Sequence, residues 1–577
     1  MLSLFGSGIG RGIAIGSAYV LKTSDIEIPH FNVEKSSVAN EVKRFNAAVL
    51  ETENKYKALL KSLPKNAPKE SAAFINAHMM MLRDPLLSEA SAKIIKSKQI
   101  NAEQALEIQS QNLISVFDQM EDPYLRNKRS DVQHITNALL RCLLGIVSHS
   151  LEEANEEDLT GKIIISKDLT PAETMFIKEK KVAGFVTDLG SPISHTAIVA
   201  RSLKMPAVVG LHASIKYISD NDILIVDGLH GTILINPTET VLKEYKNRLG
   251  KIRQREKHLK TLTSKISRTI DGRRIQLSAN IESIKEVKEV NKVNAAGIGL
   301  YRTEYLFMNR SHAPTEKEQF LAYKRIVSSV GKPVIIRTLD IGGDKQLDFG
   351  YPQKTSSESP LGLRAVRLCL NHVELFKPQL RAILRASAFG KIAIMIPMVS
   401  NYDEINQVLN IIKQTKIELK KENIAFDSRI KIGGMIEVPA AAIMADMFAK
   451  KLDFLSIGTN DLIQYTLAID RVDDAVNYLY DPIHPAVITL IKQVLMAGKA
   501  AKIPVSLCGE MAGNARYTRL LLGLGLKNFS MDTNNLLEVK ERVLSSDCKK
   551  SRYLVNKIIK SDNSNQARDY LDQLNQL

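Results

Sequence analysis

Short apolar runs alternate with helical patterns along the second half of the chain. Eight such runs follow residue 274, and each is bounded by glycine or polar residues. Strands that alternate with helices build parallel sheets, and eight β/α units within about 260 residues fit a (β/α)8, or TIM, barrel. The eight runs span residues 275–281, 297–305, 333–341, 392–399, 432–439, 454–461, 505–511 and 528–532.

The first half of the chain combines the same strand pattern with a long helical stretch. Apolar runs typical of strands occur near the N-terminus and in five segments between residues 162 and 237, whereas residues 36–148 follow helical spacing. The simplest topology for both is an α/β domain, residues 1–30 and 149–237. A helical bundle, residues 31–148, would be inserted after its N-terminal strand.

Residues 238–265 predict a long basic helix that connects this region to the barrel domain, residues 266–577. Between Val241 and Arg274 the chain has 12 Lys and Arg against 3 Asp and Glu, a net charge of +9. No nucleic-acid-binding motif accompanies these charges, so a solvated helix is favoured over a nucleic-acid-binding arm.

The composition is that of a soluble globular protein with several domains. The 577 residues predict about three to five domains, and 44% are hydrophobic against 25% charged. No apolar run reaches the length of a membrane-spanning helix, about 18 residues, and the N-terminus does not resemble a signal peptide. The four cysteines lie far apart without a CxxC pair, so no disulfide framework or zinc ribbon is expected, and the expected compartment is the cytoplasm.

Polar and reactive side chains gather at the C-terminal ends of the barrel's predicted strands. Seven of the eight apolar runs carry such a residue near that end, and the run 392–399 is the exception. Active sites of (β/α)8 barrels lie at this end because the loops after all eight strands converge there. The sequence therefore predicts a site that includes Asn280, Arg302, Arg337, Glu437, Asn460 with Asp461, Cys508 and Ser530.

Two common nucleotide-binding patterns are missing from the chain. The glycines near the N-terminus do not complete GxGxxG, and no Gly-Lys pair precedes a serine or threonine. A Rossmann dinucleotide loop is therefore not expected, and ATP or GTP hydrolysis through a Walker A loop is excluded.

A histidine stands at a predicted helix start within residues 187–210. Ser194, His195 and Thr196 follow a loop of glycine, serine and proline and precede an apolar helical segment. The positive end of the helix dipole disfavours the imidazolium form, so a ring with a reference pKa of about 6.5 stays a neutral nucleophile near pH 7. The same N–H groups would stabilise a phosphate on the ring. A structural role is the alternative for a lone histidine.

Long motifs make the chain resemble a known family. The segment GSPISHTAIVARSLKMPAVVG (190–210) is similar to the phosphohistidine signature of phosphoenolpyruvate-utilising enzymes. Further motifs of the same enzymes lie in the barrel region, and the motif order and chain length resemble the phosphoenolpyruvate-protein phosphotransferases, Enzyme I of the bacterial sugar phosphotransferase system. The barrel motifs are GLYRTEYLFM (299–308), RTLDIGGDK (337–345), GGMIEVPAAA (433–442), DFLSIGTNDLIQYTLAIDR (453–471) and LCGEMAGN (507–514).

The resemblance implies roles for individual residues. His195 would accept the phosphoryl group, and Thr174, in the motif DLTPAET, would contact it through its hydroxyl. Cys508 matches the acid that protonates the enolate, and two carboxylates, Glu437 and Asp461, match the magnesium ligands. The residues that match phosphoenolpyruvate binding are Arg302, Arg337, Arg364, Asn460 and Arg471.

The chemistry of these side chains agrees with the roles that the resemblance implies. Phosphoenolpyruvate carries a carboxylate and a phosphate, and planar arginine side chains bind both groups in bidentate fashion. Mg²⁺ prefers one or two carboxylates together with substrate oxygens. Metal and arginines would stabilise the charge of the transferring phosphoryl group. For any single arginine or aspartate, a salt bridge at the barrel rim is the alternative.

The resemblance also implies a partner for the helical bundle. Residues 74–85 and 122–132 match landmarks of the docking domain for the small phosphocarrier protein HPr. His78, Met80 and Met81 are candidates for an adaptable docking surface, because methionine side chains fit varied shapes. The alternative for each of them is the core of the bundle.

Domain motion and self-association follow from the same resemblance. His195 and the barrel pocket lie in different domains, so one fixed position cannot serve both phosphoenolpyruvate and HPr. A swivel of the α/β domain about the linker helix is therefore implied. The family also implies a homodimer that forms through the barrel, with pyruvate as the released product and no binding of nucleic acid or insertion into a membrane.

The chain departs from the family pattern at three places. Residues Gly190–Ile193 read Gly-Ser-Pro-Ile where the family often has Gly-Gly-Arg-Thr, so a loop arginine is missing. In SESPLGLR (357–364), Ser359 replaces an asparagine and one residue fewer follows Pro360, so a barrel loop would be shorter before Arg364. The segment 528–540 is more polar than its counterpart.

Other enzymes and roles share some of these sequence features and are alternatives to a sugar-transport phosphotransferase. Phosphoenolpyruvate synthase and pyruvate phosphate dikinase share the histidine segment and the barrel, but they need a nucleotide-grasp domain for which this chain has no room. The nitrogen-branch paralogue carries an N-terminal sensory domain, whereas here the phosphohistidine domain starts at residue 1. A regulatory role without sugar permeases stays open. A non-catalytic relic would be expected to lose some of Arg302, Arg337, Glu437, Asp461 and Cys508, which are all present.

Overall fold

The computed structural model divides the chain into two compact units, Met1–Arg253 and Gln254–Leu577, and each is described by itself. The described residues are 1–10, 12–21, 27–62, 69–118, 123–146, 158–169, 173, 177, 180–190, 197, 200, 205–212, 214–308, 310, 312–342, 361–470, 473 and 476–577. None of their helices is both long and apolar enough to cross a membrane.

The first unit contains an eight-stranded sheet with the strand order β1-β8-β7-β3-β4-β5-β6-β2. β3, β4, β5 and β6 pair in parallel, and the other pairings are antiparallel. Apolar side chains are buried on both faces of the sheet, which explains why its central strands are almost entirely apolar. The strands are β1 (Leu2–Phe5), β2 (Ser7–Ile9), β3 (Ile13–Val20), β4 (Ile163–Ser166), β5 (Gly184–Thr187), β6 (Ala207–Val209), β7 (Ile223–Asp227) and β8 (Thr232–Ile235).

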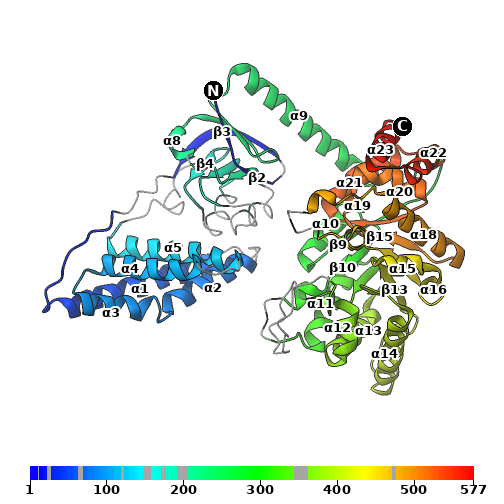
Figure 1. Cartoon of the computed structure of the whole chain (residues 1–577), viewed down its shortest axis with the longest axis horizontal. Coiled ribbons are helices and arrows are strands. Elements are labelled where there is room, and N and C mark those ends of the chain that lie inside the picture. Colours follow the sequence, from blue (N-terminus) through cyan, green and yellow to red (C-terminus); the bar gives the residue numbers. More distant parts are fainter. Residues whose placement is uncertain are drawn as a thin grey trace. The chain divides into compact units, whose positions relative to one another are not determined.

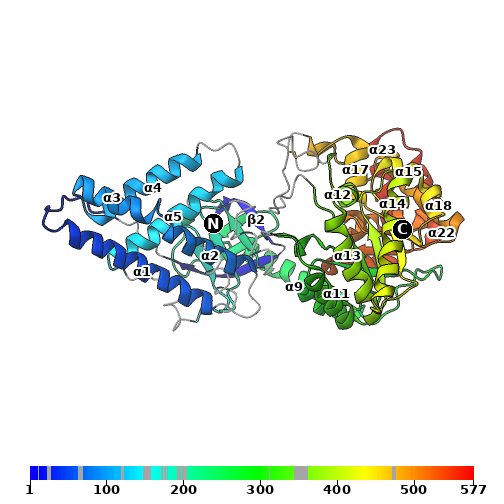
Figure 2. The same ribbon diagram turned by 90° about the horizontal axis from the view of Figure 1, so that it is seen from below.

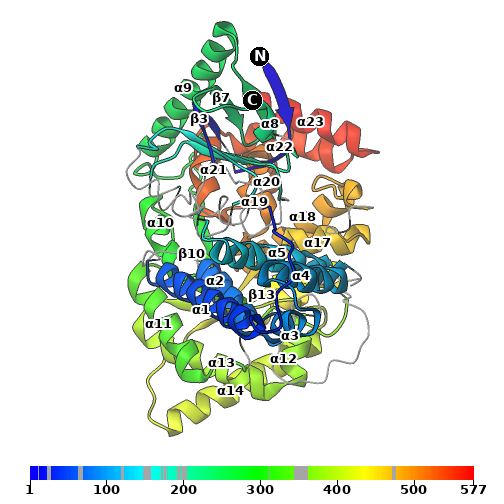
Figure 3. The ribbon, with the colours of Figure 1, turned by 90° about the vertical axis from the view of Figure 1, so that its left-hand side faces the viewer.

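A helical bundle is inserted between the neighbouring strands β3 and β4. Its helices lie side by side in Figure 1 and, seen from another direction, in Figure 3. They enclose a core around Phe45, Leu82, Leu106 and Leu139. The helices are α1 (Val38–Ser62), α2 (Lys69–Arg83), α3 (Ser88–Lys98), α4 (Ala102–Asp118) and α5 (Pro123–Leu143).

A single long helix, α9 (Glu239–Thr261), follows the sheet and contains the boundary between the two units. None of its residues is buried, which agrees with its basic, weakly apolar sequence. Near its C-terminal end, Arg255 and His258 both contact the carboxylate of Glu541 in α21 (Thr533–Leu544), at 2.9 and 3.2 Å. These contacts fix the last part of α9 to the second unit.

The second unit is a closed barrel of eight parallel strands surrounded by helices, and Figure 2 shows the outer ring. A large apolar core fills the space between strands and helices, and a small separate cluster that includes Cys508 fills the interior of the barrel. The strands are β9 (Gln276–Ile281), β10 (Ile298–Tyr301), β11 (Val334–Arg337), β12 (Ile392–Ile396), β13 (Lys431–Ile436), β14 (Phe454–Ile457), β15 (Val505–Leu507) and β16 (Asn528–Met531).

The outer helices include long segments between strands and several short pieces at the mouth. They are α10 (Val287–Lys292), α11 (Glu316–Val330), α12 (Ala365–Asn371), α13 (Val373–Ala386), α14 (Tyr402–Lys421), α15 (Pro439–Ile443), α16 (Ala445–Ala449), α17 (Thr459–Leu467), α18 (Pro485–Ala501), α19 (Glu510–Gly513), α20 (Thr518–Leu524), α21, α22 (Cys548–Ile559) and α23 (Ser564–Gln576). The (β/α)8 barrel expected from the eight apolar runs is confirmed, since each run coincides with one strand of the closed sheet and only β13 begins one residue before its run.

The strands are shorter than the apolar runs that predicted them. The strand within run 297–305 ends at Tyr301, and the strand within 333–341 ends at Arg337. The remaining residues of these runs leave the sheet and enter the loops at the barrel mouth, where Thr303 bonds through its side chain to the Arg337 carbonyl and the Asp340 N–H bonds to the Glu304 side chain. The discrepancy therefore marks the places where the functional loops begin.

Glycine 299 tests how closely the interior of the barrel is packed. A Cβ atom at this position would collide with Ser530 Oγ and lie 2.9 Å from the Ser278 Cβ. We expect Gly299→Ala to destabilise the barrel by about 1–3 kcal/mol in urea unfolding, because overpacking forces neighbours to shift. Gly250→Ala in α9 is the matched control. Nothing lies within 4 Å of that position, so the helix should instead gain up to about 1 kcal/mol. Equal effects of the two changes would contradict this packing.

Candidate active site

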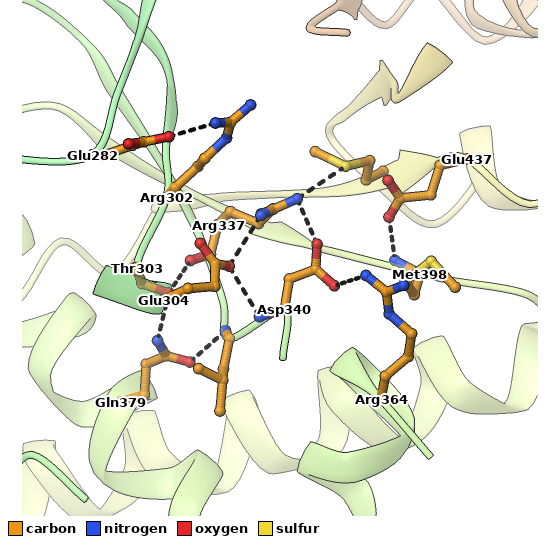
Figure 4. A network of polar contacts seen from close by, with 12 residues as sticks. Glu282, Arg302, Thr303, Glu304, Arg337, Asp340, Arg364, Gln379, Met398 and Glu437 are labelled. Atoms are coloured by element: carbon orange, nitrogen blue, oxygen red, sulfur yellow. Dashed lines mark hydrogen bonds and ion pairs between the residues drawn. The ribbon is translucent and has the colours of Figure 1, made fainter. Parts of the chain in front are cut away.

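Side chains from several strand ends meet at one mouth of the barrel. Arg302 follows β10, Arg337 ends β11 and Glu437 follows β13, while Asp461 lies at the start of α17 after β14. Their charges influence one another: Arg337 interacts with Glu437, and Asp461 interacts with both Glu437 and Arg364. Figure 4 shows three of the residues that the sequence placed at strand ends, Arg302, Arg337 and Glu437, together with Arg364.

Arg337 is a buried cation held by two buried carboxylates. Its residue is 8% exposed, and its guanidinium contacts Glu304 Oε1 at 3.0 Å and Asp340 Oδ2 at 2.6 Å. Burial alone would lower the pKa of Arg337, but the charges of Asp340, Glu304 and Glu437 raise it above its usual value. The guanidinium is therefore permanently charged and fixed in position before any ligand arrives.

Asp340 connects two arginines through its two oxygens. Oδ2 accepts from Arg337, and Oδ1 accepts from Arg364 Nη2 at 3.1 Å, so the carboxylate lies between the two guanidinium groups in Figure 4. The Asp340 side chain is only 5% exposed, and its backbone N–H donates to Glu304 Oε1 at 3.0 Å. Burial lowers the pKa of Arg364, but Asp340 leads the groups that raise it, and the net shift is upward.

Arg302 is the most accessible of these arginines. Its side chain is 40% exposed and donates from Nη1 to Glu282 Oε1 at 2.5 Å. Glu282 is itself 31% exposed, so this pair lies in contact with solvent. An anion that enters the mouth can compete with Glu282 for Arg302 more easily than it can displace Asp340 from Arg337, because exposed ion pairs contribute little free energy.

A second layer of polar contacts fixes the strand ends beneath the arginines. Thr303 Oγ1 donates to the Arg337 carbonyl oxygen at 2.9 Å. Gln379 of α13 donates from Nε2 to Thr303 Oγ1 at 3.1 Å and accepts from the Leu339 N–H at 2.9 Å. Gln379 and Thr303 are both buried. The loops after β10 and β11 are thus tied to each other and to an outer helix.

The carboxylate of Glu437 is buried where its ionised form is unfavourable without a cation. The residue is 1% exposed, and Oε1 accepts from the Met398 N–H at 2.6 Å. Burial, together with the charges of Asp461 and Asp340, raises the pKa of Glu437 well above its usual range, although Arg337 opposes the shift. A bound cation would favour the charged form.

One side of the Glu437 carboxylate faces a glycine, Gly458. A Cβ atom at Gly458 would come within 2.6 Å of Glu437 Oε2, so glycine keeps this side of the carboxylate open. Within the described part of the chain, no group of three or more His, Cys, Asp or Glu side chains is arranged to hold a metal ion. Two carboxylates, Glu437 and Asp461, with remaining positions left for ligand oxygens, match the preference of Mg²⁺ rather than that of zinc.

Cys508 lies inside the barrel below the arginines. It is 4% exposed and packs with Leu300, Met395, Met435 and Phe454. Burial raises the pKa of its thiol to about 11, although a hydrogen bond from Ser456 Oγ to Sγ, at 3.3 Å, opposes the shift. The thiol is therefore protonated at neutral pH, and its Sγ–H donates to the Ile457 carbonyl oxygen at 3.6 Å. A protonated thiol can act as a general acid.

The remaining polar residues at strand ends mainly bind each other. Ser530 Oγ donates to Asn280 Oδ1 at 2.5 Å, and Asn280 Nδ2 donates to the Cys508 carbonyl oxygen at 3.0 Å. Asn460 donates from Nδ2 to Glu510 Oε1 at 3.0 Å and accepts from the Glu510 N–H at 2.9 Å. These contacts hold the ends of β9, β15 and β16 together and join the starts of α17 and α19.

A cavity of about 390 Å³ adjoins the mouth on its Glu437 side. Met398 and Val438 line it. The Met398 N–H donates to Glu437, and Val438 is the next residue after Glu437 in the chain. Gln464 and Tyr465 of α17 also line it.

Several residues expected from the sequence cannot be placed in the site. His195, Thr174 and Arg471 lie outside the described residues, as do most of the two departing loops, residues 191–193 and 343–360. Arg364 is described and reaches the site through Asp340 in spite of the departure in the segment before it.

The candidates for a docking surface on the bundle differ in exposure. Met80 is 72% exposed, whereas Met81 packs against the bundle core. His78 is 1% exposed. It therefore belongs to the buried interior of the bundle, and the prediction that it lies on a docking surface is wrong. His78 and Met81 are three positions apart and therefore lie on the same face of α2, whereas Met80 lies on another face.

The carboxylates that position the arginines were not identified from the sequence. Glu282 contacts Arg302, Glu304 contacts Arg337, and Asp340 contacts both Arg337 and Arg364, although none of the three carboxylates ends a predicted strand. The available signal was an acidic residue two or three positions after each strand-ending arginine, in Arg-Thr-Glu and Arg-Thr-Leu-Asp. Buried arginine requires such a partner.

Comparisons with known proteins match nearly the whole chain. Three family models match: "PEP-utilising enzyme, N-terminal" over residues 6–128, "mobile domain" over 159–231 and "PEP-binding domain" over 256–548, where PEP is phosphoenolpyruvate. The phosphoenolpyruvate-protein phosphotransferase of Cupriavidus necator is 41% identical over 99% of both chains. Those of Buchnera aphidicola and a Bacillus species are also 41% identical, over 97% and 94% of this chain and 98% and 93% of their own lengths.

The role of Asp340 can be measured by unfolding. Asp340→Ala leaves Arg337 and Arg364 without their shared carboxylate, and we expect the barrel to lose about 3–5 kcal/mol in urea unfolding, because an uncompensated buried charge is strongly destabilising. The matched control is Asp572→Ala, which breaks an ion pair with Arg516 in which both side chains are about half exposed. The control should lose less than about 1 kcal/mol. Similar losses for both variants would show that Asp340 does not hold the site together.

Proposed function

Since the chain belongs to the phosphoenolpyruvate-protein phosphotransferases, a family of phosphoenolpyruvate-utilising enzymes, we propose that it transfers the phosphoryl group of phosphoenolpyruvate to His195 and then to the phosphocarrier protein HPr. Pyruvate would be released, and the reaction would be the first step of the sugar phosphotransferase system. The observation that carries the proposal is the pair of guanidinium groups fixed by Asp340 opposite the buried carboxylate of Glu437.

The arginines differ in mobility: two guanidinium groups are fixed in place, and a third can move toward the anionic groups of the substrate. Arg337 and Arg364 are held in place by Asp340 and need no rearrangement when a ligand binds. Arg302 is exposed and paired with an exposed glutamate, so it can turn to an incoming phosphate or carboxylate. Asn460 and Arg471 complete the proposed binding set. Fixed cations aimed at the transferring phosphoryl group lower the barrier because they need no reorganisation.

Magnesium is the proposed cofactor, and Glu437 and Asp461 are the residues that would hold it. When bound, it supplies positive charge to the phosphate oxygens of the substrate and to the enolate oxygen. The raised pKa of Glu437 supports this assignment, because a buried carboxylate surrounded by like charges is stabilised by a cation.

Cys508 is the proposed donor of the proton that completes pyruvate. When the bond between phosphorus and the enol oxygen breaks, the bonding electrons stay on oxygen and form an enolate. The methylene carbon of the enolate takes the proton from Cys508 Sγ, and the thiolate left behind is reprotonated from solvent. A thiol with a pKa of about 11 and a place beneath Arg302 and Arg337 is suited to this step.

The acceptor and the docking surface belong to the first unit. His195 would attack the phosphorus through a ring nitrogen, with Thr174 in contact, and the helical bundle would bind HPr, with Met80 as one exposed apolar residue on it. The motion of the phosphohistidine domain about the linker α9 remains part of this proposal. The family resemblance further supports a homodimer that forms through the barrel and a location in the cytoplasm.

The division of labour predicts a clean separation of binding from phosphorylation. His195→Ala should abolish phosphorylation by phosphoenolpyruvate, because the nucleophile is lost, while calorimetry in Mg²⁺ should still detect phosphoenolpyruvate at the barrel. Mass spectrometry under alkaline conditions, which preserves phosphohistidine, measures the modification. A phosphoryl group on another residue of the variant would exclude His195 as the acceptor.

The role of Cys508 predicts a separation of protonation from phosphoryl transfer. Cys508→Ser should slow pyruvate formation by about 10²–10⁴-fold, the usual contribution of a positioned acid, with little change in phosphoenolpyruvate binding. The pyruvate that this variant forms in deuterated water should lose facial selectivity at its methyl carbon. Because the thiol must be protonated to donate, its contribution should persist to pH 9 and fall as the pH approaches 11.

The control for Cys508 is Cys142→Ser in the bundle, which should leave turnover unchanged, since Cys142 is a free cysteine that lies outside the barrel. Unchanged turnover and stereochemistry in the Cys508 variant would remove this thiol from the mechanism.

A further inference from the structure

A histidine of the helical bundle contacts the α/β domain beside the loop that carries the acceptor's proposed partner. His134 of α5 lies with Nε2 2.9 Å from Oδ2 of Asp168, which follows β4. The two side chains are 25% and 29% exposed. Asp168 is the first residue of the motif DLTPAET, which ends at Thr174. The contact therefore joins the bundle to the start of this motif.

Asp168 divides its two oxygens between its own loop and the bundle. Oδ1 accepts from the Leu169 N–H at 2.8 Å, and Oδ2 faces His134. The hydroxyl of Ser166, the last residue of β4, donates to the Asp168 carbonyl oxygen at 2.6 Å. The backbone at Asp168 is thus anchored to the sheet, and the Asp168 side chain is anchored to α5. A change at His134 would be transmitted to Asp168.

Several further titratable groups surround His134. Asp131 on α5 and Glu173 in the same motif act on its charge, in addition to Asp168. The ring of His78, on α2, lies 6.3 Å from the His134 ring, and Asp131 Oδ1 lies 3.9 Å from His78 Nε2. Tyr56 of α1 packs edge-on against His78 with the ring centres 5.7 Å apart. Three carboxylates and two histidines therefore meet between the bundle and the α/β domain.

Electrostatics favour a charged His134 in this environment. Burial lowers the pKa of the ring, but Asp168, Asp131 and Glu173 raise it, and the net shift is upward from the reference value. Nδ1 is buried and has no hydrogen-bond partner among the described residues. The ring's hydrogen bonding within that part of the chain thus runs through Nε2 to Asp168, and removal of the Asp168 carboxylate would remove its main support.

We propose that His134 is a positioning residue for phosphoryl transfer: its imidazolium holds Asp168 and thereby ties the loop of Thr174 to the HPr-docking bundle. The inference rests on the proposed function for the roles of Thr174, His195 and the bundle. The charge-assisted bond between an imidazolium and a carboxylate is roughly twice as strong as a neutral hydrogen bond. Protonation of His134 therefore sets how firmly the loop and the bundle are held together.

The pH range of this contact follows from the sign of the shift. A histidine whose pKa is raised in the folded protein contributes stability that is fully present below its unfolded pKa, about 6.5, and that is lost as the pH rises through the folded value. The contact is therefore strongest below about pH 6.5 and weakens as the pH rises through the raised pKa of His134.

A double-mutant cycle in the full chain tests this coupling. The variants are His134→Asn, Asp168→Asn and the double variant, and the readout is the rate of phosphoryl exchange with HPr. At pH 6.5 we expect about a tenfold slower exchange in His134→Asn, which corresponds to about 1.4 kcal/mol, and less than threefold at pH 9. In the Asp168→Asn background the His134 change should have little further effect. Each rate is divided by that of the unsubstituted chain at the same pH, which cancels the titration of HPr itself.

The chain offers a matched control in His230. Its Nδ1 lies 2.8 Å from Asp227 Oδ2, but the His230 side chain is 66% exposed and the pair lies within one hairpin of the α/β domain. His230→Asn should leave the exchange rate unchanged at both pH values. Equal slowing by His134→Asn at pH 6.5 and 9, or fully additive effects in the cycle, would overturn the proposal.

A readout that needs no activity separates this inference from the proposed function. Histidine labelled with ¹³C at Cε1 allows NMR titration of each ring in the full chain. The pKa of His134 should lie above 6.5 and fall in Asp168→Asn but not in His230→Asn. A chain that transfers no phosphate yet shows this titration would contradict the proposed function and leave the contact standing. A His134 ring that titrates at or below 6.5, unaffected by Asp168→Asn, would contradict the contact itself.

Discussion

The site at the barrel mouth depends on one carboxylate shared by two buried cations. Asp340 uses one oxygen for Arg337 and the other for Arg364, and it brings together the end of β11 and the start of α12. Without it, two guanidinium groups would repel each other in a poorly solvated place. With it, they are fixed at a set separation, and their remaining N–H groups are available to an anion. Desolvation of the arginines is therefore offset during folding, before any ligand binds.

The charge of Glu437, opposite the arginines, also depends on the charged groups around it. Its neighbours Asp461 and Asp340 disfavour its charge, while Arg337 favours it, so the carboxylate is balanced between two states. A cation bound beside Glu437 would favour the charged form of this carboxylate. Because such a cation and an anion at the arginines would attract each other, each would favour the binding of the other.

Much of the barrel and its site could be predicted because both follow from short patterns. Apolar runs gave the eight strands, and the rule that barrel sites lie at C-terminal strand ends gave Arg302, Arg337, Glu437 and Cys508. The strand ends were placed too late, since apolar residues such as Leu339 continue beyond the last sheet bond. Buried strands and buried loops look alike in a sequence.

Contacts between elements that are distant in the chain could not be predicted from the sequence. Asp340 and Glu304 were missed because the pairing of a carboxylate with an arginine depends on which loops meet at the mouth. His134 and Asp168 belong to different elements, and only the folded sheet and bundle bring them together. The burial of His78 could not be told from its neighbours Met80 and Met81, because the helix face that meets the core is set by its packing partners.

The insertion of the bundle between β3 and β4 has a consequence for folding during synthesis on the ribosome. β3 is made within the first 20 residues, yet its neighbours in the sheet are β4, from residue 163, and β7, from residue 223. During synthesis the bundle can fold through contacts among its own helices, α1 to α5. The N-terminal strands remain unpaired until β4 and β7 have been made. For that interval the nascent chain exposes an apolar edge that a chaperone, or another copy of the chain, can bind.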